Sequence, residues 1–157
     1  MRSEVDRIWI PAGIDVQWLD AGSVSDDRVP DLRVMVDRDW HWSKIGAPAE
    51  YPVAEFQRSR ALVSVSLSRA WSVVAQALGI AEMNTGPDRL RFNVLGLVLG
   101  RTIAHEIGHY LLGPEHRDSG LMRRAFHARE FVDRRSGAFN LGPADLARLA
   151  GTLRRPS

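Results

Sequence analysis

The chain of 157 residues contains no cysteine, so disulfide bonds are excluded and a metal site must use histidine and carboxylate ligands. It also lacks an apolar run of about 18 residues, the length that a membrane-spanning helix requires. No N-terminal signal peptide is visible, because residues 1–7 are charged and the apolar segment 8–10 is far too short. We therefore expect no membrane partner and a cytoplasmic location, unless the chain is a processed or truncated form.

Lysine is nearly absent, since Lys44 is the only lysine among 21 basic residues. The basic excess lies after the middle of the chain, in Arg123-Arg124, Arg134-Arg135 and Arg154-Arg155. Arginine clusters can neutralise nucleic-acid phosphates, but no nucleic-acid-binding motif accompanies these. We therefore favour a solvated basic surface over a nucleic-acid partner. With 45% hydrophobic and 25% charged residues, the composition is that of one globular domain.

The pattern H-E-x-x-H stands at His105, Glu106 and His109. On a helix, side chains four residues apart lie on the same face, so both imidazoles can reach one metal ion. Glu106 then projects beside the metal, where it can hold a water without being a ligand. This arrangement is typical of zinc hydrolases. The alternative, an amphipathic helix with two surface histidines, is disfavoured because the apolar run 94–103 indicates a buried helix.

A tetrahedral catalytic zinc needs one more protein ligand and an open position for water. Gly113 and Pro114 predict the end of the helix, after which the chain can turn back and present His116. Zinc itself is inferred from the ligand type, since imidazole also suits other first-row metals.

With Ser119-Gly120-Leu121-Met122 following these histidines, residues 90–125 resemble the metzincin metallopeptidases, and most of all a small bacterial, matrixin-like group. The family motif is H-E-x-x-H-x-x-G-x-x-H followed by a methionine-containing turn. Here three residues, rather than two, separate His109 from Gly113, and the turn follows His116 closely.

The resemblance implies a zinc endopeptidase. One catalytic zinc would be held by His105, His109 and His116, with Glu106 as general base and Met122 packed beneath the metal without ligating it. Some metzincins place a tyrosine that assists the oxyanion two residues after this methionine, and Arg124 stands there instead. The expected partner is a peptide or protein substrate, and the oligomeric state is left open.

The fold that the resemblance implies is α+β: a small metzincin-like domain with a twisted mixed sheet, an antiparallel edge strand on a long active-site helix, the Met-turn and a C-terminal helix. A single catalytic domain would place the sheet and active-site helix in 1–112, and the third ligand, Met-turn and C-terminal helix in 113–157. Alternating and helical spacings predict the individual elements. The strands are expected over 14–18, 32–36 and 61–68, and the helices over 69–78, 94–112 and 143–149.

Two further expectations concern the active-site helix and the strand before it. Asn93 is the expected N-cap of the helix, and its glycines Gly96 and Gly100 predict close packing against the sheet. In metzincins the preceding strand is an antiparallel edge that pairs with an extended substrate. By this resemblance the substrate-binding edge would be Val63, Ser64, Val65 and Ser66, with a plain edge strand as the alternative.

Two other functions remain open. The segment also resembles regulatory zinc peptidases that cleave repressors and take their third ligand from a glutamate on a following helix, for which Glu130 is the candidate. A non-catalytic metal-binding interaction module is the other. Glu106 argues against it, because three histidine ligands do not need this carboxylate.

Overall fold

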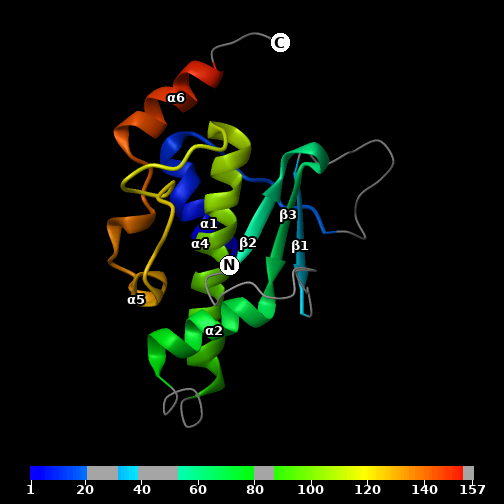
Figure 1. The fold of residues 1–157 in the computed structure, drawn as a ribbon, viewed down its shortest axis with the longest axis vertical. Helices are drawn as coiled ribbons and strands as arrows, with labels where there is room; N and C mark the ends of the chain where they lie inside the picture. Colours follow the sequence, from blue (N-terminus) through cyan, green and yellow to red (C-terminus); the bar gives the residue numbers. More distant parts are fainter. Residues whose placement is uncertain (21–31, 39–52, 80–86, 154–157) are drawn as a thin grey trace, which may run out of the picture.

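The computed structural model describes residues 1–20, 32–38, 53–79 and 87–153. The fold is α+β, with a three-stranded mixed sheet and a long helix, α4 (Asp88–Leu112). Helix α4 lies between the sheet and the C-terminal elements (Figure 1). In the described part of the chain, no helix has the length and apolar character needed to cross a membrane.

The sheet has the order β1-β3-β2, formed by β1 (Arg33–Asp37), β2 (Ala54–Gln57) and β3 (Leu62–Ser66). Strand β3 runs parallel to β1 and antiparallel to β2. The predicted strands 32–36 and 61–68 are thus confirmed, but the prediction that the latter is an edge strand is wrong. Strand β2, which the sequence did not predict, pairs with the second edge of β3, and the β3 serines Ser64 and Ser66 are buried at 1% exposure.

Two helices follow the sheet. Helix α2 (Leu67–Leu78) begins where the Ser66 side chain accepts a hydrogen bond from the Arg69 backbone N–H, and Gly79 ends it as predicted. Helix α4 begins earlier than expected, with Pro87 as its N-cap, so the prediction of Asn93 as N-cap is wrong. It ends at Leu112. The next residue, Gly113, has a φ of 99°, a backbone conformation that residues with a Cβ rarely adopt.

The N-terminal segment is helical where no helix was predicted. Helix α1 (Arg2–Trp9) continues into the 3₁₀ turn η1 (Ile10–Ala12), and the predicted strand 14–18 has no strand structure. Its alternating apolar residues instead pack against the core as an irregular segment. The close packing at Gly100 is made with α1 rather than with the sheet, because a Cβ there would lie 2.7 Å from Glu4 Cβ.

The segment after α4 contains α5 (Ala128–Val132), the 3₁₀ turn η4 (Gly137–Phe139) and α6 (Pro143–Leu153). Helix α6 confirms the predicted C-terminal helix. Three aromatic rings from this segment pack on one another, with centroids 4.4–5.6 Å apart: Phe126, Phe131 and Phe139.

Candidate metal centre

The structure brings together the three histidines that the sequence singled out. One ring nitrogen of each of His105, His109 and His116 lies within 4.8 Å of the others, a grouping that can hold a metal ion. The first two come from adjacent turns of α4, and the third from the segment that turns back after Gly113. The additional residue between His109 and Gly113 therefore does not prevent the third histidine from reaching the other two.

Two backbone carbonyls orient the first two imidazoles. His105 Nδ1 lies 2.6 Å from the Leu121 carbonyl oxygen, and His109 Nδ1 lies 3.1 Å from that of Gly113. Because a carbonyl can only accept, both Nδ1 atoms carry the proton and donate it. This tautomer leaves the Nε2 lone pairs available for a metal, which is the usual way in which surrounding groups fix histidine ligands.

The environment favours the neutral form of His105 and His116. The pKa of His105 is lowered to about 4, mainly by burial and also by the nearby His109 and His116, while the hydrogen bond to the Leu121 carbonyl opposes this change. The pKa of His116 is also lowered, by partial burial and by the electrostatic repulsion that a second positive charge would meet from His109 and Arg124. Neutral imidazole is the form that ligates a metal, so the site requires little deprotonation before binding.

The turn that contains Met122 packs against the part of α4 that carries His105 and His109. Met122 is 1% exposed, and its sulfur occupies the space beside Gly108, within the H-E-x-x-H segment. The turn is held by hydrogen bonds from Leu121 N–H to the Asn140 carbonyl and from Arg117 N–H to the Met122 carbonyl, each 2.8 Å long. Met122 therefore packs against the turn of α4 that lies between His105 and His109.

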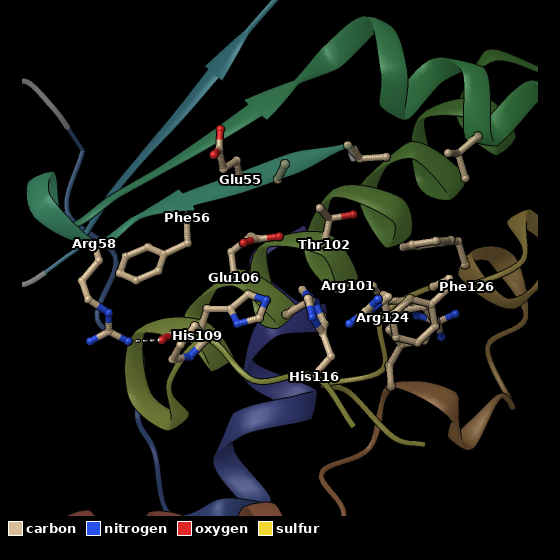
Figure 2. A pocket seen from close by; sticks show the side chains of 18 of the residues that line it. Glu55, Phe56, Arg58, Arg101, Thr102, Glu106, His109, His116, Arg124 and Phe126 are labelled. Carbon is tan, nitrogen blue, oxygen red and sulfur yellow. Dashed lines mark hydrogen bonds between the residues drawn. The ribbon is translucent and has the colours of Figure 1, made fainter. Parts of the chain in front are cut away.

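Glu106 is the buried acid of the site, with 7% of its surface exposed. Its pKa is raised to about 8, mainly by burial and to a smaller extent by Glu55, while a hydrogen bond from the Phe56 backbone N–H opposes the rise. Figure 2 shows Glu106 between the β2 backbone and the histidines. The carboxyl is thus oriented by an edge strand and ready to exchange a proton near neutral pH.

The three histidines and Glu106 line a cleft of about 1010 Å³, which extends past the histidines on both sides (Figure 2). Strand β2 forms one wall, with Ala54, Glu55 and Phe56. The proposed edge residues Val63, Ser64, Val65 and Ser66 do not line the cleft. The nearest strand is instead β2, whose sequence Ala-Glu-Phe-Gln alternates over only four residues, too short a pattern to have been predicted.

Backbone geometry directs part of β2 towards the cleft. Ser66 N–H donates to the Val53 carbonyl at 2.8 Å. Since bonded and non-bonded pairs alternate along an antiparallel ladder, Glu55 directs its backbone groups to β3, whereas Ala54 and Phe56 direct theirs away from it. The hydrogen bond from Phe56 to Glu106 agrees with this pattern.

Three arginines line the cleft, Arg58, Arg101 and Arg124, and none of them was given a substrate-binding role from the sequence. Arg58 donates to the His109 carbonyl at 3.0 Å, beside the end of α4 (Figure 2). Arg101 is fully buried, one helical turn before His105, and also lines the cleft. Its position as the one charged residue within the apolar run 94–103 was a signal that could have identified it.

Glu130 does not join the histidines. Its carboxylate accepts hydrogen bonds from Arg123 at 2.6 Å and from the His127 backbone N–H at 2.7 Å, where it caps α5. Arg123 and the capping bond lower its pKa. In this arrangement Glu130 stabilises the start of a helix rather than completing a metal site.

Comparisons with models of known protein families, with curated proteins and with solved structures found no match for this chain.

Proposed function

We propose that this chain is a zinc-dependent endopeptidase with a metzincin-like catalytic domain. The observation that carries the proposal is the convergence of three histidine nitrogens beside a buried glutamate, in a cleft walled by an edge strand. In this proposal the histidines bind the metal, the glutamate transfers the proton and the edge strand aligns the substrate.

The donor set fits a zinc ion. Neutral imidazoles suit zinc, and ligands at about 2.0–2.1 Å from a tetrahedral metal lie roughly 3.3 Å apart, which small side-chain movements within the observed 4.8 Å can reach. Three protein ligands leave one position open, as in catalytic rather than structural sites. A bound zinc would lower the pKa of a water and polarise a peptide carbonyl.

Glu106 supplies the proton transfer. Its carboxylate would take a proton from the attacking water and give it to the leaving amine, as a general base and then a general acid. The raised pKa of this buried group favours such exchange near neutral pH, and the Phe56 N–H holds it in place. A positive ion nearby would lower that pKa.

Strand β2 provides a means of aligning the substrate. The N–H and carbonyl of Ala54 and the carbonyl of Phe56 point away from β3, while the Phe56 N–H is engaged by Glu106, so an extended peptide can add to this edge through those three groups. The side chains of the peptide would then alternate between the cleft and the opposite face. The substrate edge is therefore proposed at 54–57, in place of the earlier expectation at 63–66.

The direct test is cleavage of a peptide library by the zinc-loaded protein and by Glu106→Gln. We expect cleavage by the wild type, a loss of kcat of at least about 1000-fold in Glu106→Gln, and unchanged zinc content. Glu115→Gln is a matched control, because Glu115 is an exposed acid in the same region and is paired with Arg148. Zinc binding without cleavage of any peptide would instead support a non-catalytic metal-binding module.

A further inference from the structure

The feature of interest is the guanidinium group of Arg101. It is fully buried, and two of its nitrogens are engaged: Nε donates to Glu4 at 2.7 Å, and Nη1 donates to the Glu130 backbone carbonyl at 2.6 Å. The third nitrogen, Nη2, has no hydrogen-bond partner among the described residues. A buried N–H group without an acceptor is unfavourable, and more so when it is charged.

The unpartnered nitrogen belongs to a side chain that lines the cleft. The Arg101 guanidinium lies 4.9 Å from the centre of the Phe139 ring, and the rings of Phe126 and Phe131 line the same end. Aromatic walls exclude water and strengthen any charge–charge contact made there. This end of the cleft therefore combines a cationic donor with an apolar wall.

The local charge at this end is positive. Glu4 is shared between Arg101 and Arg7, so these three side chains together carry one excess positive charge. Arg124, an exposed residue two positions before Phe126 in the chain, adds a second cation to the cleft lining. The acidic residues of the lining are Glu55 and Glu106, which lie on the β2 side.

We propose that this end of the cleft binds a carboxylate of the substrate, with Arg101 and Arg124 as the residues that determine specificity. The inference rests on the proposed peptidase function. Arg101 precedes His105 by one helical turn, about 6 Å along the axis, which corresponds to roughly two residues of an extended peptide. The carboxylate therefore belongs to a substrate residue within two positions of the scissile bond.

Two sources can supply this carboxylate: an aspartate or glutamate side chain, or the C-terminus of a short peptide. The panel that separates them contains peptides of one sequence with glutamate or glutamine at each position flanking the scissile bond. Each is prepared with an amidated and with a free C-terminus. A preference for glutamate in amidated peptides identifies the side chain, and a preference for the free acid in glutamine peptides identifies the C-terminus.

We expect kcat/KM to be at least tenfold higher for the carboxylate-bearing peptide than for its neutral partner. Arg124→Gln should reduce this ratio severalfold, and Glu4→Gln/Arg101→Met, which removes both members of the buried ion pair, should reduce it to near one. Arg129→Gln is the matched control, because Arg129 is an exposed arginine on α5 that does not line the cleft. Circular dichroism checks the fold of each variant. If the double variant does not fold, the kcat/KM ratio of the exposed Arg124→Gln variant tests the inference by itself, and an unchanged ratio would overturn it.

A binding measurement separates this inference from the proposed function. Calorimetric titration of the metal-free protein with the same peptides should show tighter binding of the carboxylate peptide, a preference that is reduced severalfold in Arg124→Gln but unchanged in Arg129→Gln. Cleavage and binding without any carboxylate preference would overturn the inference and leave the peptidase proposal standing. Selective binding without cleavage of any peptide would support the carboxylate site and overturn the peptidase proposal.

Discussion

The sulfur of Met122 occupies the position that a side chain at Gly108 would need: a Cβ built on Gly108 would lie 2.2 Å from Met122 Sδ. The methionine thus packs directly under the helical turn that joins the first two metal-ligand candidates. The preceding residue, Leu121, uses its carbonyl to orient His105. One turn of the chain therefore both supports the helix and fixes a ligand.

This contact predicts that Gly108→Ala weakens both the fold and the metal site. The new methyl group must displace a side chain that is 1% exposed and has little room to move, which typically costs about 1–3 kcal/mol. Zinc affinity should fall as well, because displacing the turn moves the Leu121 carbonyl from His105. Denaturant unfolding and zinc titration measure the two effects.

The matched control is Gly151→Ala, on α6, where an added Cβ meets nothing within 4 Å. It should stabilise the protein by about 0.5–1 kcal/mol, the usual gain from alanine in a helix. Adding Met122→Ala to Gly108→Ala should recover part of the lost zinc affinity. If Gly108→Ala lowered neither the free energy of unfolding nor the zinc affinity, the proposed packing of Met122 against Gly108 would be wrong.

The buried ion pair between Glu4 and Arg101 predicts how stability depends on pH. Burial alone would raise the pKa of Glu4, but the hydrogen bonds and charges of Arg7 and Arg101 outweigh it, so the pKa lies below the usual value of 4.5. The ionised carboxylate therefore stabilises the folded state fully above that value. The stabilisation is lost as the pH falls through the lower, folded-state pKa.

We expect Glu4→Gln to reduce the free energy of unfolding at pH 7 by roughly 3 kcal/mol, within the range for breaking a buried ion pair. The difference from the wild type should shrink as the pH falls below 4.5, because protonation removes the charge from Glu4 as well. Urea unfolding at several pH values tests this, with the exposed Asp118→Asn as control. If the difference in unfolding free energy between wild type and Glu4→Gln grew towards acid pH, the lowered pKa assigned to Glu4 would be contradicted.

The orientation of β2 predicts an alternating dependence on the substrate backbone. In a peptide bound to Glu106→Gln, methylation of single backbone nitrogens should weaken binding at every second position, by about tenfold for each lost hydrogen bond. The alternate positions should tolerate the methyl group, because their N–H groups point away from the strand. Fluorescence titration measures the series. Equal effects at successive positions would exclude strand addition at 54–57.

The sequence was sufficient where the spacing of a few residues determines the geometry. The i, i+4 histidines and the helix end at Gly113 are local features, and the structure brings together the three histidines that they predicted. The central strand, α2 and the C-terminal helix were also found from periodicity.

The errors arose where distant segments decide the outcome. Ser64 and Ser66 suggested an exposed edge, but whether a strand lies at an edge depends on its neighbours, and β2 is only four residues long. The glycines of α4 indicated a close contact without revealing that its partner is α1. Likewise, the role of Arg101 depends on Glu4, 97 residues away in sequence.

The central claim is that three histidines, and not Glu130, hold a catalytic zinc. Elemental analysis and zinc titration of the wild type, His116→Ala, Glu130→Gln and His127→Ala test it most directly, with His127 as the matched control because it lies outside the histidine triad. We predict one zinc per chain in the wild type, Glu130→Gln and His127→Ala, and a loss of affinity of at least about 100-fold in His116→Ala. Zinc retained in His116→Ala but lost in Glu130→Gln would contradict this account and assign the third ligand to the glutamate.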